Sequence, residues 1–266
     1  MQDNSTDDLL TLIALGVLAF VVADVAHEAL GHGLATLAVG GKPVILTTSY
    51  FGSSGSTSRW IPAAGGMANV AVGFLSFLAV RLLRTAGPHA RYFFTLSTAF
   101  NLLFATAYPA YSGLAAFGDW AAVISGLSPA WLWRVLLIAL SGLSYYLSLK
   151  LIAAEISPFC GSDEPQALER LRRITLVPYV AALAIAAFAG AFNPNGWTTI
   201  FTAALPAAAA AFGLTQVDHF PGARSRNLSV PAAPAITRSA KWMVAALVAA
   251  VFFVAVLGPG IRFGSD

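Results

Sequence analysis

The sequence predicts a helical membrane protein with about six or seven transmembrane helices, and three observations indicate this fold class. Of the 266 residues, 58% are hydrophobic and only 10% are charged, whereas soluble domains usually carry about a quarter charged residues. Apolar stretches long enough to cross a bilayer recur along the whole chain. Basic residues gather in the polar stretches between them, where they orient a protein in the membrane. We therefore expect an all-α polytopic fold.

The expected spans are separated by short polar or glycine-rich stretches. After the first span, residues 40–60 combine an apolar β-branched run with a Gly/Ser turn, which predicts a β-hairpin or re-entrant loop. The stretch 108–120 is interrupted by Pro109, Gly113 and Gly118, so we expect a discontinuous helix there. A charged loop, 155–173, and a polar stretch, 215–240, join later spans. The seven spans cover about residues 9–39, 61–83, 91–112, 130–153, 174–192, 197–214 and 241–258.

These spans form a single integral membrane domain over residues 1–266. Its core would cover residues 9–127, and additional helices would follow over 130–258. The net charge of +3 comes from basic residues in loops between spans, which does not indicate nucleic-acid binding. The expected partner is the lipid bilayer, and the oligomeric state does not follow from the sequence.

The basic residues also predict an orientation. The segments 81–91, 150–173 and 214–241 hold 11 of the 15 Lys and Arg residues, and seven spans place all three on one side. The positive-inside rule makes that side cytoplasmic. We therefore expect a multi-pass protein of the plasma or inner membrane, with its N-terminus in the cytoplasm and the hairpin and C-terminus outside.

The first span carries a polar cluster within AHEALGHGLA and just before it. Asp24, His27, Glu28 and His32 fall within nine residues of an otherwise apolar segment. A charge in mid-bilayer costs about 2.5–3.5 kcal/mol on insertion scales, so such residues usually line an interior site. With Cys160 as the only cysteine, any metal must be held by His, Asp and Glu.

Zinc explains these residue types. Imidazole nitrogens are good Zn²⁺ ligands, and catalytic zinc lowers the pKa of a bound water to about 7. A neighbouring carboxylate can take the proton and later deliver it to a leaving amine. The cluster therefore predicts His27 and His32 as zinc ligands and Glu28 as the catalytic general base and acid.

The two histidines are five positions apart, which on a regular helix rotates their side chains apart by about 140°. A π-bulge would bring His32 back beside His27, and Gly31 and Gly33 make such a distortion cheap. Alternatively, Glu28 and His32 are themselves ligands and His27 supports them. The bulge is the preferred interpretation.

AHEALGHGLA in one span, a hairpin-like loop, and AAGGMANVAVG in the next span together resemble the site-2 protease family of intramembrane zinc metalloproteases, over about residues 20–120. In that family the motif helix supplies two His ligands and the Glu base, and a later N-x-x-P…L-D-G motif supplies an Asp. Here NLLFATAYPAYSGLAAFGDW offers Asn101, Pro109 and Asp119, with a wider spacing and GDW in place of LDG. The resemblance implies a zinc-dependent endopeptidase that cleaves membrane-embedded or membrane-proximal polypeptides, with Asp119 as the third ligand.

The position of Asp119 in the chain supports this assignment independently. It is the only acidic residue between Glu28 and Glu155, and it follows the outward third span. That topology places it at the same depth as His27 and His32, although a helix N-cap would explain it too.

Several other polar residues have two possible roles each. Within the resemblance, Asn69 would hold the substrate backbone or the transition-state oxygen, and a helix-packing amide is the alternative. Asp24 and Asn101 join it as candidate substrate-binding or supporting residues. Residues 44–51 could pair with an unwound substrate strand or simply connect two spans. His219 caps a helix end, or becomes a spare ligand if the last spans fold back.

Two other functions fit the same cluster. One is a membrane zinc hydrolase acting on a lipid amide or ester. The other is a transporter or scaffold in which the His/Asp/Glu cluster relays protons or binds an ion.

Overall fold

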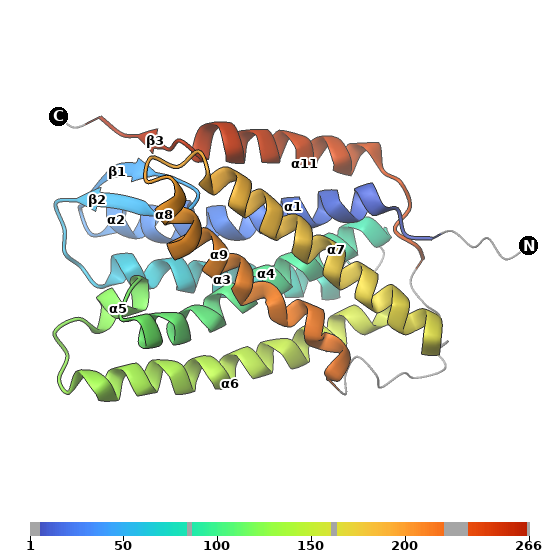
Figure 1. The fold of residues 1–266 in the computed structure, drawn as a ribbon, viewed down its shortest axis with the longest axis horizontal. Helices are drawn as coiled ribbons and strands as arrows, with labels where there is room; N and C mark the ends of the chain where they lie inside the picture. Colours follow the sequence, from blue (N-terminus) through green and yellow to red (C-terminus); the bar gives the residue numbers. More distant parts are fainter. Residues whose placement is uncertain (1–5, 84–86, 161–163, 221–233, 265–266) are drawn as a thin grey trace, which may run out of the picture.

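Long helical columns lie side by side in the structure, a computed structural model that describes residues 6–83, 87–160, 164–220 and 234–264 (Figure 1). The elements are α1 (Leu9–Val25), the π-helix η1 (Ala26–Gly33), α2 (Leu34–Ala38), β1 (Lys42–Leu46), β2 (Phe51–Ser54), α3 (Trp60–Leu82), α4 (Pro88–Ala115), α5 (Asp119–Ile124), α6 (Ala130–Ile156), the short turn η2 (Ser157–Phe159), α7 (Glu164–Gly190), α8 (Trp197–Thr199), η3 (Ile200–Ala204), α9 (Leu205–Ala210), η4 (Ala211–His219), α11 (Ala240–Phe252), η5 (Phe253–Leu257) and β3 (Ile261–Arg262).

Among the described residues, five helices are long and apolar enough to cross a membrane. They are Leu9–Ala38, Trp60–Leu82, Ala130–Phe159, Gln166–Gly190 and Ala240–Leu257. Their outer surfaces carry large apolar side chains: Leu75 is 65% exposed, Leu143 61% and Val248 64%. Soluble monomers rarely expose contiguous apolar surface of this kind, so these helices fit a lipid environment.

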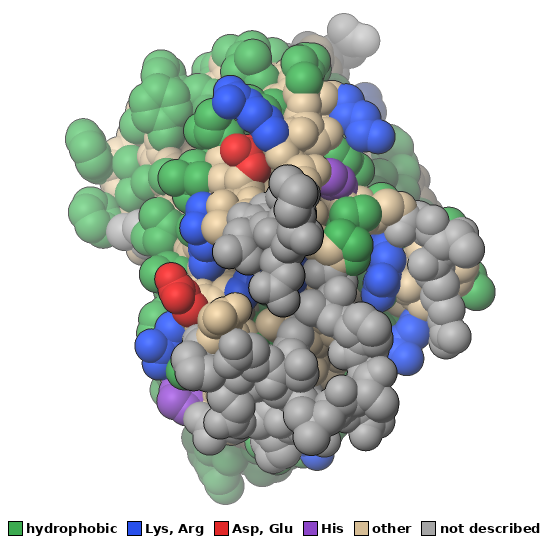
Figure 2. Space-filling model, turned by 90° about the vertical axis from the view of Figure 1, so that its right-hand side faces the viewer, with side chains coloured by type: hydrophobic (Ala, Val, Ile, Leu, Met, Phe, Trp, Pro, Cys, Tyr) green, Lys and Arg blue, Asp and Glu red, His purple; other side chains and the backbone are tan. Residues whose placement is uncertain are grey.

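Most basic residues of the described segments gather at one end of the bundle, as the sequence predicts. Arg81 pairs with Glu155, and the Arg91 guanidinium lies over the Phe159 ring. Figure 2 shows further Lys and Arg side chains on this end. Here Arg170 also holds the N-terminal segment through Asp7. Arg84, Arg224 and Arg226 lie outside the described residues.

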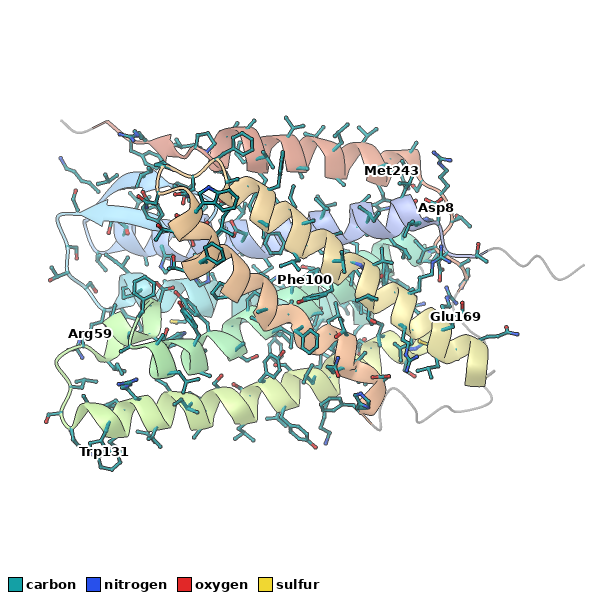
Figure 3. The ribbon with its side chains drawn as sticks, viewed as in Figure 1. Asp8, Arg59, Phe100, Trp131, Glu169 and Met243 are labelled. Atoms are coloured by element: carbon teal, nitrogen blue, oxygen red, sulfur yellow. The ribbon has the colours of Figure 1, made fainter. Side chains whose placement is uncertain are left out.

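Opposite ends of the bundle are joined by a tightly packed centre. Figure 3 shows Asp8 and Glu169 near one end, Arg59 and Trp131 near the other, and Phe100 between them. Phe20 of α1 packs edge-on against Phe100 and Phe104 of α4 and Phe253 of η5, with ring centroids 5.7–6.2 Å apart. This aromatic cluster fixes α1 about one turn before the polar cluster begins at Asp24.

The predicted hairpin after the first span is confirmed, but it belongs to a larger sheet. β1 and β2 are antiparallel, and the C-terminal β3 adds to the other edge of β1, giving the order β2-β1-β3. The expectation of an all-α fold with only a hairpin is therefore incomplete. Ile261 and Arg262 carry no strand signal of their own, and tertiary proximity to β1 decides their conformation.

The expected interruption at 108–120 lies later than predicted. α4 continues through Pro109 and Gly113 to Ala115, and the chain breaks only at Ala116 and Gly118, which adopt positive φ angles of 54° and 87°. Proline removes the backbone donor that would bond the Ala105 carbonyl. In the same turn the Ser141 hydroxyl of the neighbouring α6 donates to the carbonyl of Thr106, which holds α4 against α6.

Two other expectations need correction. Residues 155–173 are mostly helical, because α6 and η2 extend to Phe159 and α7 begins at Glu164. The single expected span at 197–214 is four short segments, α8, η3, α9 and η4, which extend to His219. Within the polar stretch 215–240, residues 221–233 lie outside the described residues.

Glycines allow η1 to pack directly on α3. A Cβ atom on Gly31 would lie 2.6 Å from the Ala64 carbonyl oxygen and 2.6 Å from the Gly65 Cα. Both neighbours are backbone atoms, which cannot move aside without separating the two helices. The close approach therefore requires glycine at this position.

We expect Gly31→Ala to lower the free energy of unfolding by about 1–3 kcal/mol, the usual cost of overpacking. Thermal unfolding in detergent micelles, followed by intrinsic fluorescence, measures this change. Gly142→Ala in α6 is the matched control, because a Cβ there meets no atom within 4 Å. Equal melting temperatures for the two variants would contradict the packing described here.

Candidate metal centre

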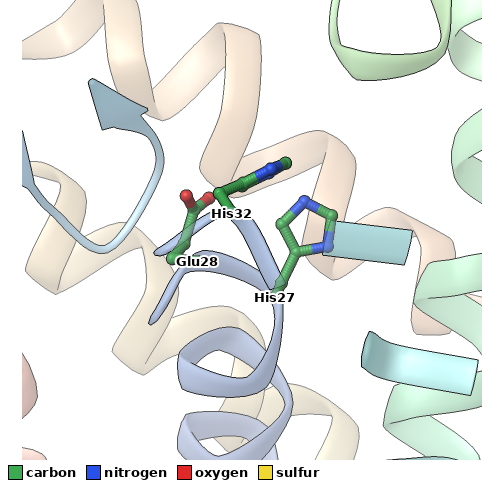
Figure 4. A group of neighbouring side chains, drawn as sticks. All are labelled: His27, Glu28 and His32. Atoms are coloured by element: carbon green, nitrogen blue, oxygen red, sulfur yellow. The ribbon is translucent and has the colours of Figure 1, made fainter. Parts of the chain in front are cut away.

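The π-helix η1 brings the two histidines of the first span together. In a π-helix the hydrogen bonds run from residue i to i+5, so side chains five positions apart share a face. His27 and His32 are five apart within Ala26–Gly33, and their ring centroids lie 4.8 Å apart (Figure 4). The predicted bulge is confirmed, and it extends over the whole eight-residue segment.

Asp119 meets both histidines from the far side of the bundle. It is the first residue of α5, directly after Gly118, and its backbone N–H donates to the Tyr108 hydroxyl at 3.3 Å. Its Oδ2 lies 3.0 Å from His27 Nε2 and 3.2 Å from His32 Nε2. Residues 92 positions apart in the chain thus converge on one point.

Asn69 of α3 orients the His27 ring. Its Nδ2 group donates to the Ala23 carbonyl at 2.8 Å and to Asn101 Oδ1 at 2.9 Å. Both N–H groups are used, so Asn69 Oδ1 is the acceptor for His27 Nδ1, 2.8 Å away. The hydrogen-bond network therefore puts the proton of neutral His27 on Nδ1 and leaves the Nε2 lone pair facing Asp119.

The backbone of α3 orients His32 in the same way. His32 Nδ1 lies 2.7 Å from the carbonyl oxygen of Ile61, which can only accept. The neutral ring therefore also carries its proton on Nδ1 and presents an Nε2 lone pair to Asp119. Such outer hydrogen bonds from metal-ligating histidines fix the tautomer and raise ligand basicity.

Two imidazole lone pairs and a carboxylate oxygen that converge on one point are a donor set that could hold a cation. Around a tetrahedral zinc ion with bonds of about 2.0–2.2 Å, ligand atoms are separated by roughly 3.3–3.6 Å. The observed separations between Asp119 Oδ2 and the two Nε2 atoms, 3.0 and 3.2 Å, are a few tenths of an ångström shorter, so a small outward shift of the side chains would accommodate the ion. The donor set of His27, His32 and Asp119 therefore fits zinc.

The charge of Asp119 suits the same role. Burial alone would raise the pKa of its carboxyl, but protonated His27 and His32 rings donate Nε2–H groups to Asp119, and these bonds outweigh burial and hold the pKa well below its usual range. The carboxyl is therefore ionised at neutral pH, as a metal ligand must be.

Glu28 lies beside this point. The residue is 7% exposed, and its buried Oε2 atom has no hydrogen-bond partner among the described residues. Ligand atoms of His27, Glu28 and His32 lie within 4.8 Å of one another (Figure 4). The alternative in which Glu28 is a ligand therefore remains geometrically open, and an unpartnered carboxylate equally suits a proton acceptor.

Gly65 keeps the opposite side of the site open. A Cβ atom there would lie 2.6 Å from the Nε2 atoms of both His27 and His32. Any larger residue at this position would fill the space between the ligand atoms. The sequence drew attention to Gly65 only as a helix-packing glycine, because nothing local indicates that it faces two imidazoles.

A cavity of about 470 Å³ opens onto the candidate metal centre. Its walls include the histidines and Glu28 on one side and Tyr50 and Phe51 of the hairpin on another. Thr198, Thr199 and Thr202 of α8 and η3 line the remaining wall. Sequence analysis missed this wall, because these threonines carry no recognisable motif and approach the site only through the tertiary fold.

Of the remaining candidate residues, Asn69 belongs to the site and His219 does not. Asn69 is fully buried, with its amide committed to His27, Ala23 and Asn101, so it supports the histidine rather than contacting a substrate. His219 is at the end of η4, at the basic end of the bundle, where it lies 3.5 Å from Asp218 and near Arg172. The last spans do not fold back, and His219 is not a spare ligand.

In comparisons of this chain with protein-family models, curated proteins and solved structures, no match was found.

We expect Asn69→Leu to weaken zinc binding by about 10- to 100-fold, the usual cost of losing an outer hydrogen bond to a metal-ligating histidine. Competition with a chelator of known affinity measures the dissociation constant. Thr98→Val is the matched control, because this buried hydroxyl donates only to a carbonyl of its own helix. An unchanged zinc affinity in Asn69→Leu would show that His27 is not a ligand.

Proposed function

We propose that the protein is an intramembrane zinc-dependent endopeptidase that cleaves membrane-embedded or membrane-proximal polypeptides. The observation that carries this proposal is the convergence of His27 Nε2, His32 Nε2 and Asp119 Oδ2 beside the unpartnered carboxylate of Glu28. These three residues are the ligand set that the resemblance to site-2 proteases implies. Because Asp119 is 92 positions from His27 in the chain, chance convergence is a poor explanation.

The metal and the reaction are inferred from the donors and their surroundings. Two histidines and one carboxylate also bind non-haem iron, but a free carboxylate next to the ligands is what hydrolytic zinc sites use as a base. Bound zinc supplies Lewis-acid chemistry, lowering the pKa of a water to about 7 and polarising a carbonyl.

The chain's own residues then perform the proton transfers. Glu28 Oε2 is buried and unpartnered, so its carboxylate can accept a proton from the attacking water and deliver it to the leaving amine. Asn69 and the Ile61 carbonyl hold the two imidazoles in the ligating tautomer throughout. The cavity between the hairpin and η3 has room for an extended segment of substrate beside Glu28.

The membrane arrangement is part of the proposal. We infer seven crossings, formed by the five apolar helices together with α4 and the broken column from Trp197 to His219. An odd number fits the termini, which lie at opposite ends of the bundle (Figure 1). With the basic end in the cytoplasm, the candidate metal centre faces the outer leaflet.

We expect Glu28→Gln to lower kcat by about 100- to 10,000-fold, because the general base is lost, while one zinc per chain remains bound. Fluorogenic transmembrane peptides in liposomes report cleavage, and elemental analysis of the purified protein reports the metal. Asp119→Ala is the comparison variant and should lose both zinc and activity. Loss of zinc in Glu28→Gln would make Glu28 a ligand, and iron in place of zinc would overturn the hydrolytic assignment.

We expect a cysteine placed between β2 and α3, at the end of the bundle that carries the hairpin, to react with a membrane-impermeant maleimide added outside intact cells. Thr57→Cys tests this end, and Gln166→Cys tests the basic end, which should react only after permeabilisation. Both positions are exposed, and the native Cys160 is buried. The reverse labelling pattern would place the candidate metal centre on the cytoplasmic side.

A further inference from the structure

A second cavity lies behind Glu28 and is lined largely by apolar side chains. It has a volume of about 380 Å³, within the range of small-ligand pockets. It shares His27, Glu28 and Thr202 with the cavity at the candidate metal centre, so the two spaces meet at the proposed base. Phe104 of α4 and Ala207 of α9 contribute to its apolar walls.

Asp24 is the one carboxylate besides Glu28 among the residues that line this cavity, whose other polar groups are the His27 imidazole and hydroxyls of serine, threonine and tyrosine. It precedes Glu28 by four residues in the first helix, and both carboxylates line the cavity. The buried Oδ2 of Asp24 has no hydrogen-bond partner, and no Lys or Arg of the described residues forms an ion pair with Asp24. The chemistry proposed for Glu28 does not use Asp24.

An unpartnered carboxylate at this depth is expensive for the fold. A buried charge costs free energy unless it is paired and hydrogen-bonded, and intramembrane acidic residues normally face a functional partner. The described residues provide no partner for Asp24 Oδ2, so a cationic group of a ligand that enters the cavity would supply one. Apolar walls that lead to a carboxylate complement a long apolar stem with a cationic tip, the form of Lys and Arg side chains.

We propose that this second cavity is a specificity pocket for a Lys or Arg side chain next to the cleaved bond, with Asp24 pairing its cationic group. This inference rests on the proposed endopeptidase function. Because the pocket begins at Glu28, a side chain that fills it would position the adjoining peptide bond beside the proposed base. The preferred substrates are therefore membrane polypeptides with a basic residue near the end of a span.

Cleavage of matched peptides tests the pocket. Transmembrane peptides that differ at one position flanking the cleaved bond would carry Lys, Arg or the uncharged norleucine. We expect wild-type kcat/KM to favour the basic peptides by about tenfold or more, and Asp24→Asn to remove this preference. Glu169→Gln, an exposed carboxylate at the far end of the bundle, is the matched control and should keep it. A preference that survives Asp24→Asn would overturn the proposal.

A binding measurement tests the pocket independently of peptidase activity. We expect n-hexylamine to raise the melting temperature of the wild-type protein in micelles, 1-hexanol to have little effect, and Asp24→Asn to lose the response to the amine. Ala207→Leu, which narrows the cavity and keeps the carboxylate, should also lose it, and this covers the case in which Asp24→Asn does not fold. An equal amine response in all variants would overturn the pocket. If the protein binds no zinc and cleaves no peptide but keeps the amine response that depends on Asp24, the pocket stands and the proposed peptidase function is wrong.

Discussion

The π-helical turn in the first membrane helix is the constraint on which the rest of the structure depends. Five positions separate His27 from His32, and only the wider helical turn places both imidazoles on one face. Gly31 lets this segment lie directly against the backbone of α3. Local backbone geometry therefore sets the ligand positions and the helix packing together.

A buried hydrogen-bond network converts this local geometry into a rigid site. The Asn69 amide links three helices, because it contacts Ala23 and His27 of the first helix and Asn101 of α4 from its own position in α3. Each polar atom of the amide has a partner, as a polar group within a membrane bundle requires. Fully satisfied networks of this kind specify one arrangement, which the proposed catalytic site would need.

Helices that follow the predicted core of residues 9–127 contribute walls to the site. The broken column of α8, η3 and α9 supplies walls for both cavities, and the Tyr111 hydroxyl ties it to α4 by donating to the Thr202 carbonyl at 3.1 Å. Irregular backbone at membrane depth is tolerated where it lines a cavity. This explains why residues 197–214, which the sequence predicts as one span, form several short helical segments in the structure.

By itself, the sequence determined the helical class, the hairpin, the sorting of basic loops to one end, and the cluster His27, Glu28 and His32, because hydropathy and intramembrane charge are local signals. It also indicated the π-turn, since the spacing of the histidines and the flanking glycines are visible in a few residues. Only the tertiary structure decided that Asp119 reaches both imidazoles, that Gly65 and the Ile61 carbonyl face them, and that Ile261 and Arg262 form a strand. These contacts join residues far apart in the chain, and their side chains carry no local pattern that records which partner they meet.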